Sequence, residues 1–144
     1  MSGDPPGSVL FMCSRNSVRS PMASALTRRV FGSRIYVASV GLNPGEPDSI
    51  AIQVMNEMGV DISSRRPRGV DELEETSFDL VVALSSDARG KAEELARTFG
   101  ATVEYWPTPD PTAFEGSREM RLAAYRELRD KLLGRIRVRF EPAA

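Results

Sequence analysis

The sequence predicts an α/β fold of three α/β/α layers, in which helices cover both faces of a four-stranded parallel sheet. Short apolar segments alternate with longer segments of helical periodicity along the 144 residues, a pattern typical of parallel sheets. The segment Phe78–Leu84 is apolar almost throughout, as expected of a strand buried on both faces. The length fits one domain, 1–144, in which 1–7 form a flexible, proline-rich tail.

The first half of the chain alternates strand and helix. Ser8–Met12 is an apolar run bounded by a polar loop, and Arg34–Val40 is rich in β-branched and aromatic residues, so both are expected to be strands. A helix is expected from Pro21, because proline suits the first helical turn. A second helix is expected from a cap at 48–49 to a C′ residue at Gly59.

The second half continues the alternation. After a basic loop and a short acidic helix comes the strand Phe78–Leu84. A helix with a serine cap at 85–86 follows and ends at Gly100. The fourth strand is expected at Thr102–Trp106, then a loop stiffened by prolines, then a last helix at 117–140. Ligands of such sheets bind beyond the carboxyl ends of the strands, where the first loop and the proline loop converge.

Composition narrows the classes of partner and compartment. The net charge of −1 gives no attraction to nucleic acid or to an anionic membrane, and no apolar run is long enough to span a bilayer. The N-terminal residues lack the apolar core of a secretory signal. A single cysteine cannot form an internal disulfide. We therefore expect a cytoplasmic protein with neither nucleic-acid nor membrane partners.

The chain contains no histidine. This excludes Ser-His and Cys-His dyads and any zinc site that needs imidazole, and one cysteine cannot supply a thiolate cage. We expect no metal and no cofactor. An active cysteine would have to be stabilised as a thiolate by something other than a histidine base.

The only cysteine, Cys13, ends the first predicted strand and begins the stretch "CSRNSVRS". A loop between a strand end and a helix N-terminus points successive backbone N–H groups at an anion, and the helix dipole adds to the effect. Arg19 can bind two oxyanion oxygens as a fork, and Ser20 is placed to hydrogen-bond the sulfur. The same field favours a thiolate. The alternative, a buried apolar cysteine beside a surface arginine, is less consistent with this context.

A thiolate inside an oxyanion cradle predicts attack on a tetrahedral oxyanion such as a phosphate ester. The leaving group then needs a proton, and without histidine its donor must be a carboxyl group. Asp110, in the "PDP" of the proline loop, lies at the correct edge of the sheet and is the candidate general acid. The alternative is a simple turn residue, because Asp-Pro pairs are common in turns.

With these motifs, the chain resembles the low-molecular-weight protein tyrosine phosphatase superfamily, including its arsenate reductase branch, over nearly its whole length. "CSRNSVRS" is similar to the family's Cys-x5-Arg-Ser loop, "GVDISSRRPR" to the loop after the second helix, "FDLVVAL" to the central strand and "PDP" to the acid loop. The resemblance implies the phosphotyrosine phosphatase I-like fold and a phosphocysteine on Cys13. It also implies Asp110 as acid and then base, and a phosphate-binding loop made of Ser14, Arg15, Asn16, Ser17, Val18 and Ser20, with Arg19 binding the transition state and Asn16 shaping the loop.

The sequence departs from this family at several positions. Arg15 stands where the family usually has glycine, and we expect a solvated side chain there. Thr112 and Ala113 follow the Asp-Pro pair where phosphotyrosine-specific members carry tyrosines, with Phe114 beyond. "VVALSSDARGKA" and "YWPTPDP" resemble the arsenate reductase branch more closely, yet the positions of the second and third relay cysteines hold Ser85 and Ala92. An internal disulfide relay is therefore impossible.

Three functions remain open. The leading hypothesis is a cysteine-dependent phosphomonoester hydrolase, a protein tyrosine phosphatase acting on a phosphorylated protein or a small phosphate ester. The second is an arsenate reductase in which an external thiol or redoxin resolves a Cys13–arsenic adduct. The third is a non-catalytic oxyanion-binding module. Phosphate and arsenate are nearly isosteric, so the cradle alone does not choose between the first two.

Overall fold

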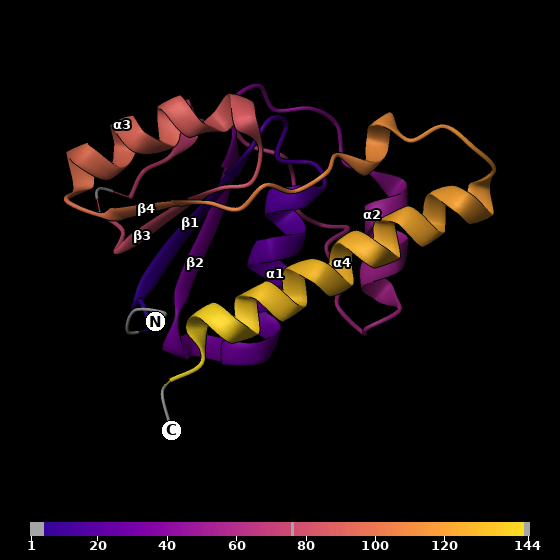
Figure 1. Ribbon diagram of the computed structural model, residues 1–144, viewed down its shortest axis with the longest axis horizontal. Coiled ribbons are helices and arrows are strands. Elements are labelled where there is room, and N and C mark those ends of the chain that lie inside the picture. The colour runs from indigo at the N-terminus through magenta and orange to yellow at the C-terminus, as the bar shows by residue number, and fades with distance from the viewer. Residues whose placement is uncertain (1–4, 76, 143–144) are drawn as a thin grey trace.

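A computed structural model describes residues 5–75 and 77–142 and contains a four-stranded parallel sheet in the order β2-β1-β3-β4. Helices α1, α2 and α4 cover one face and α3 covers the other (Figure 1). The predicted three-layer α/β/α fold is confirmed. The strands are β1 (Ser8–Cys13), β2 (Tyr36–Gly41), β3 (Leu80–Ala83) and β4 (Thr102–Tyr105), and the α-helices are α1 (Arg19–Phe31), α2 (Ser49–Asn56), α3 (Arg89–Phe99) and α4 (Arg118–Phe140).

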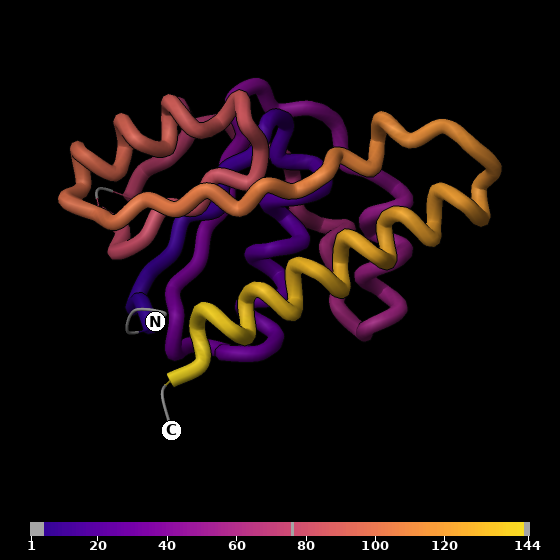
Figure 2. The backbone as a smooth tube through the Cα atoms, in the orientation of Figure 1, coloured from indigo at the N-terminus to yellow at the C-terminus, as the bar shows by residue number. Residues whose placement is uncertain are grey.

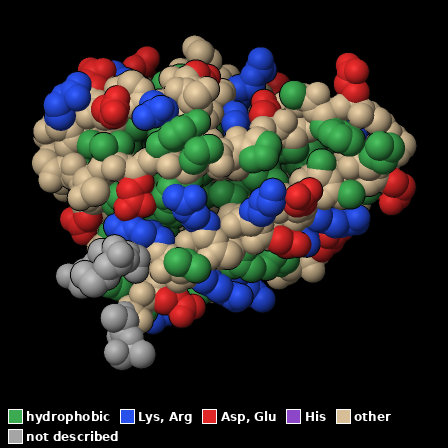
Figure 3. Space-filling model, viewed as in Figure 1, with side chains coloured by type: hydrophobic (Ala, Val, Ile, Leu, Met, Phe, Trp, Pro, Cys, Tyr) green, Lys and Arg blue, Asp and Glu red, His purple; other side chains and the backbone are tan. Residues whose placement is uncertain are grey.

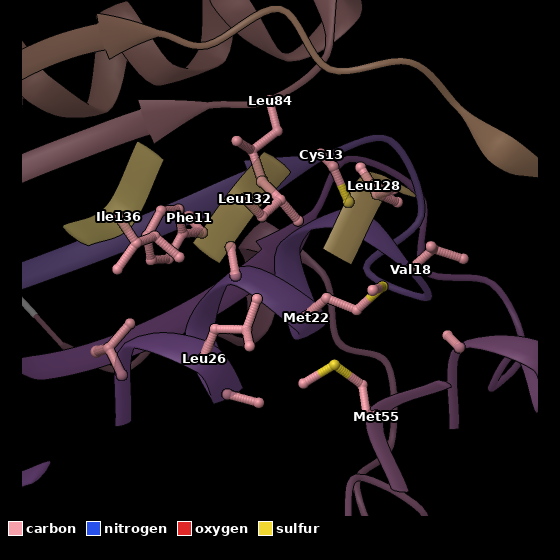
Figure 4. Close-up of a cluster of buried hydrophobic side chains, with 14 of the residues drawn as sticks. Phe11, Cys13, Val18, Met22, Leu26, Met55, Leu84, Leu128, Leu132 and Ile136 are labelled. Atoms are coloured by element: carbon pink, nitrogen blue, oxygen red, sulfur yellow. The ribbon is translucent and has the colours of Figure 1, made fainter. Parts of the chain in front are cut away.

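The sheet divides the hydrophobic core into two clusters, because successive side chains of a strand point to opposite faces. Phe11 and Cys13 of β1 face the larger cluster, which α1, α2 and α4 complete. Leu10 and Met12 face the smaller one, which α3 completes with Ala92 and other small side chains. Figure 4 shows the larger cluster, with Cys13 at the end of β1. The sulfur therefore lies where the core meets the upper edge of the sheet.

The strand order creates a switch point at the carboxyl ends of β1 and β3. The chain leaves β1 through α1 towards β2 on one side, whereas β3 and then β4 lie on the other. In Figure 2 the loops after β1 and after β2 meet at the same edge of the sheet. A crevice opens where neighbouring strands connect in opposite directions, and Cys13 stands at its rim.

Local sequence chemistry explains most helix ends. Asp48 caps α2 by accepting hydrogen bonds from two backbone N–H groups, and Ser117 caps α4 through the N–H of Met120. Gly100 ends α3 in the left-handed conformation, with φ of 68°. The caps at Asp48 and Gly100 agree with the sequence predictions, whereas the cap at Ser117 was not predicted.

Four details differ from the predictions. Helix α1 begins at Arg19 rather than Pro21, because the loop 14–18 that follows β1 turns directly into the helix. Helix α2 ends at Asn56, so that Gly59, with φ of 74°, lies beyond the expected C′ position. The expected acidic helix is only a 3-10 turn, η2 (Val70–Glu72). Neither Ser85 nor Ser86 caps α3, because the 3-10 turn η3 (Ser86–Ala88) precedes this helix and its N-cap is Ala88.

The N-terminal segment, the helices and the surface charges also bear on the sequence predictions. Of the expected tail 1–7, residues 1–4 lie outside the described part, and Gly7 donates to Asp79 Oδ2 at 2.8 Å. No helix within the described residues is long and apolar enough to cross a membrane. Acidic and basic side chains are interspersed on the face in Figure 3. Glu57, the residue that follows α2, pairs with Arg126 and Arg129 of α4.

Candidate active site

The loop after β1 turns its carbonyl groups outward. The carbonyls of residues 13–15 accept hydrogen bonds of 2.9–3.1 Å from backbone N–H groups in the segment 42–45. Because a trans peptide holds C=O and N–H on opposite sides, the N–H groups of residues 14–16 point the other way, towards the loop's interior. Within the described part of the chain, the N–H groups of 14–18 donate to no other group. Such a run of N–H groups is suited to an anion.

Asn16 fixes the conformation of this loop. It is fully buried and adopts φ of 56°, a left-handed conformation that asparagine tolerates better than most residues. Its Nδ2 donates to Ser20 Oγ at 2.7 Å, and its Oδ1 accepts from the backbone N–H of Arg68 at 2.9 Å. The Arg65 guanidinium also donates to Asn16, to Oδ1 and to the carbonyl oxygen. The role that the resemblance implied for Asn16, shaping the loop, has a direct structural basis.

Gly41 allows β2 to approach the loop closely. A Cβ atom at this position would lie 2.7 Å from the carbonyl carbon of Arg15 and 2.7 Å from the backbone nitrogen of Asn16. Any side chain would therefore displace backbone rather than a flexible side chain. The loop and the end of β2 are consequently built as one packed unit.

The Cys13 thiol lies at the base of this unit and is only 2% exposed. Its Sγ is 3.0 Å from Ser20 Oγ. Since Ser20 Oγ accepts a hydrogen bond from Asn16, its own proton can point to the sulfur and stabilise a thiolate. Helix α1 begins six residues after the cysteine, so its N-terminal dipole acts in the same direction. The structure thus places Ser20 where the sequence predicted it.

Arg19 is held at the rim of the loop by neutral oxygens. Its Nη1 donates to the carbonyl of Thr108 at 3.0 Å and its Nη2 donates to Ser14 Oγ at 3.2 Å. Arg19 as a whole is 9% exposed. Its Nη2 lies 4.0 Å from Asp110 Oδ2. A guanidinium has further N–H donors beyond these two bonds, which leaves capacity for oxyanion oxygens.

Asp110 reaches the same pocket from the proline loop. A small pocket of about 30 Å³ is lined by Cys13, Arg19 and Asp110, together with Thr112 and loop residues. Asp110 Oδ1 accepts hydrogen bonds from the Thr112 backbone N–H at 3.0 Å and from its hydroxyl at 2.6 Å. The Asp110 side chain is 45% exposed. The two residues that the sequence proposed as nucleophile and acid therefore line one pocket.

The remaining loop residues divide into core and rim. Val18 packs into the larger core cluster at 5% exposure, next to Met22 (Figure 4). Arg15 is exposed at the pocket mouth, in agreement with the expected solvated side chain, and Ser17 is partly exposed beside it. Neither Arg15 nor Ser17 contributes a side chain to the network around Asn16.

Asp87 was missed by the sequence interpretation. Its Oδ1 accepts hydrogen bonds from Ser14 Oγ, at 2.9 Å, and from Ser85 Oγ. Burial opposes ionisation of Asp87, but these bonds and the positive Arg19 outweigh it, so that its pKa lies below the ordinary value. Asp87 thereby orients Ser14, which in turn accepts from Arg19. Its position shortly after the central strand β3, at the switch point, was the available signal.

Arg65 and Ser39 were also missed. Arg65 Nη2 donates to Ser39 Oγ at 2.7 Å as well as to Asn16. One guanidinium therefore joins β2 to the loop that follows β1. The sequence interpretation treated this arginine as part of a basic loop. A parallel bridge between Gly41 and Gly69 brings that loop back to the sheet edge, a long-range contact without a local sequence signal.

A larger open cavity of about 590 Å³ adjoins the small pocket and shares Ser14 and Arg19 with it. Its other walls come from the ends of β3 and β4, including Ser85, Asp87 and Tyr105. Within the described residues, no cluster of three or more His, Cys, Asp or Glu side chains could hold a metal ion. The site is therefore described by its thiol, its cations and its carboxylates alone.

Comparisons with known proteins agree with this geometry. An arsenate reductase of Bacillus subtilis (strain 168) is 30% identical over 129 residues, which cover 90% of this chain and 91% of that protein. A solved arsenate reductase in the phosphate-binding state superposes with a TM-score of 0.77 at 27% identity, covering 91% of this chain and 94% of the other. A low-molecular-weight protein tyrosine phosphatase from T. tengcongensis shares the fold, with a TM-score of 0.72 at 24% identity over 90% of this chain and 94% of the other.

The family model described as low molecular weight phosphotyrosine protein phosphatase matches residues 8–138. This range runs from the first residue of β1 nearly to the end of α4 and includes both pocket-lining loops. The chain therefore belongs to the low-molecular-weight phosphotyrosine protein phosphatase family, within its arsenate reductase-like branch.

Proposed function

We propose that this chain is a cysteine-dependent phosphomonoester hydrolase of the protein tyrosine phosphatase type, in which Cys13 forms a phosphocysteine intermediate. The observation that carries the proposal is the shared pocket of Cys13, Arg19 and Asp110, whose floor is a loop of inward-facing N–H groups. A thiolate, a cation and a carboxyl group around an oxyanion cradle are the parts that phosphoryl transfer to sulfur requires.

In the first step the Cys13 thiolate attacks phosphorus and a P–S bond forms while the P–O bond to the leaving group breaks. The non-bridging oxygens lie on the loop N–H groups and on Arg19, whose remaining donors can bind two oxygens as a fork. The departing alkoxide or phenoxide takes a proton from Asp110. In the second step water gives its proton to Asp110 and attacks phosphorus, the P–S bond breaks, and phosphate and the thiolate are released.

The two oxygens of Asp110 have different surroundings. Oδ1 accepts both hydrogen bonds from Thr112, whereas Oδ2 accepts none within the described part of the chain and lies 4.0 Å from Arg19. Oδ2 is therefore the oxygen that carries the transferred proton. Thr112 keeps the carboxyl group oriented towards the pocket during both steps.

The test compares two aryl phosphates that differ in how much their leaving groups need a proton. Asp110→Asn should lower kcat/KM, which reports the steps up to phosphocysteine formation, by about 10²–10⁴-fold for phenyl phosphate and by much less for p-nitrophenyl phosphate, because nitrophenolate leaves without a proton. Cys13→Ser should abolish both activities. Asp71→Asn, an exposed aspartate in η2, is the matched control and should leave both unchanged. Absence of hydrolysis by the unaltered protein would refute the proposal.

A second candidate is thiol-dependent arsenate reduction, which the names of the relatives at about 30% identity favour. In this reaction Cys13 displaces an oxygen of arsenate to form a sulfur–arsenic(V) bond. An external thiolate then attacks Cys13 Sγ and forms a mixed disulfide, while the sulfur–arsenic bond breaks and its electron pair leaves with arsenic, which is reduced from arsenic(V) to arsenic(III) and released as arsenite. A second thiol reduces the mixed disulfide and frees Cys13. The open cavity beside Ser14 offers room for such a thiol.

Arsenite release that requires an added low-molecular-weight thiol or a redoxin would support this second function. Trapping of a Cys13–thiol mixed disulfide by mass spectrometry would identify the intermediate. Efficient aryl phosphate hydrolysis with no arsenite release under any thiol would leave the phosphatase as the function.

A further inference from the structure

A second cavity, which we call the arginine cavity, lies on a different part of the molecule from the Cys13 pocket. It has a volume of about 510 Å³ and shares no lining residue with the Cys13 pocket. It is formed by α1 and by the segment that follows α2, two regions on the same side of the sheet (Figure 1). Its lining residues are Ala25, Arg28, Arg29, Gly59, Val60, Asp61, Ile62 and Arg65.

The charges of its wall are not balanced. Arg28, Arg29 and Arg65 face a single carboxylate, Asp61, and none of these arginines forms an ion pair with another described residue. Among the residues that the structure describes, Arg28 donates only to the carbonyl oxygen of Val37, at 3.1 Å, and the partners of Arg65 are neutral oxygens. The wall therefore carries an excess of positive charge, in contrast to the interspersed charges on the face in Figure 3.

Arg65 is partly buried, whereas Arg28 and Arg29 are exposed at the surface. Burial lowers the pKa of Arg65 to about 10, and the positive charges of Arg68 and Arg28 act in the same direction. Partial desolvation likewise lowers the pKa of Arg28, with Arg68 adding to the effect and Tyr36 opposing it. Cations that repel one another in partial burial are stabilised when an anion is placed between them.

We propose that the arginine cavity binds a small phosphate anion with at least two negative charges. A concave site of this volume is suited to a small molecule rather than to a nucleic acid or a flat membrane surface. Guanidinium groups bind phosphate oxygens in pairs, and the excess of arginines over Asp61 matches a dianion or a more highly charged group.

The arginine cavity is connected to the catalytic loop through Arg65. The bonds of Arg65 to Asn16 and Ser39 use Nη1 and Nη2, and the guanidinium has further N–H donors that can face an anion. An anion can therefore bind without breaking the contact with Asn16. Because such an anion binds only the folded chain, it should raise the stability of the protein in proportion to the logarithm of its concentration.

Inorganic pyrophosphate is the probe, and isothermal titration calorimetry counts its sites. Arg19→Met removes the buried guanidinium of the Cys13 pocket and should weaken binding there, because only the exposed Arg15 and the loop N–H groups remain. The arginine cavity should then be the tighter site, with a stoichiometry of one. Adding Arg28→Gln and Arg29→Gln should weaken that remaining binding at least tenfold. Arg97→Gln with Arg137→Gln removes the same charge from exposed positions on α3 and α4 and should leave it unchanged.

Two further variants distinguish binding in the arginine cavity from a general effect on folding or charge. Asp61→Asn removes the only carboxylate of the wall and should tighten pyrophosphate binding several-fold, since an asparagine oxygen can still accept from the Ser63 N–H. Arg28→Gln with Arg29→Gln should keep the aryl phosphate activity of the unaltered protein and should lower its unliganded melting temperature only slightly, through loss of the bond from Arg28 to the Val37 carbonyl oxygen. No binding by Arg19→Met, or binding that survives loss of both α1 arginines, would overturn the proposal, whatever the protein's catalytic activity.

Discussion

The two loops that line the Cys13 pocket are held in very different ways. The loop 13–20 is mostly buried, apart from the exposed Arg15, and is tied to β2 and to the segment 65–68 by backbone and side-chain hydrogen bonds. The proline loop is more exposed, and Asp110 is held by Thr112 and approached by Arg19. Stabilising an anion requires fixed donors, because donors that must reorganise lose their advantage. A proton carrier needs only to reach the leaving group, so the looser loop is consistent with its proposed role.

The strongest challenge to the rigid loop is Gly41→Ala. The new Cβ would lie 2.7 Å from two backbone atoms of residues 15 and 16, so the backbone itself must shift. We expect a loss of about 3 kcal/mol in the free energy of unfolding, at the upper end for overpacking, together with loss of aryl phosphate hydrolysis. Urea denaturation and a turnover assay measure the two. A stable and fully active variant would show that the loop is not held by this close approach.

Arg65→Met tests the buried support of the same loop with nearly conserved chain length. The change removes the charged donors of Asn16 and Ser39, and we expect a loss of about 2 kcal/mol in stability. Since Asn16 positions the N–H groups, kcat/KM should fall further than the loss of folded protein explains. Arg66→Met, a neighbour whose side chain is 83% exposed, is the control and should behave like the unaltered protein. Equal activity of both variants would contradict the positioning role.

The contrast between the loops also marks how far sequence reasoning reached. The strands, Cys13, Arg19 and Asp110 follow from local patterns: apolar runs, a strand-to-helix loop and a proline-bounded carboxylate. Arg65 could not be found in this way, because its partner Asn16 lies 49 positions away and the segment between α2 and β3 contains only the short 3-10 turn η2, which does not predict its path. Asp87 was missed because serines beside it suggested a helix cap, whereas Ser85 and Ser14 both donate to its carboxylate.

Glu57 provides a pH test in the scaffold, away from both loops. Hydrogen bonds from Arg126 and Arg129 lower its pKa to about 2 from an ordinary 4.5. A carboxylate whose pKa is depressed by folding stabilises the protein fully above its unfolded pKa, and this contribution is lost as pH falls from about 4.5 towards 2. Melting temperature should therefore decline over this window, and Glu57→Gln should flatten that decline. The pair is partly exposed, so the change should be smaller than for either loop variant. An identical decline in Glu57→Gln would exclude this ion pair as a source.

The smallest expected change in stability comes from a substitution in the proline loop itself. Thr112→Val removes the hydroxyl that donates to Asp110 Oδ1 at 2.6 Å but keeps the backbone N–H bond. Because the bond is exposed to solvent, we expect a stability change of about 0.5 kcal/mol. The kcat/KM for phenyl phosphate should nevertheless fall several-fold while that for p-nitrophenyl phosphate is nearly retained, since only the phenoxide leaving group needs the proton of the acid in the step that forms the phosphocysteine. If both substrates lost activity equally, Thr112 would act on binding rather than on proton transfer, and Asp110 would be positioned by the proline loop alone.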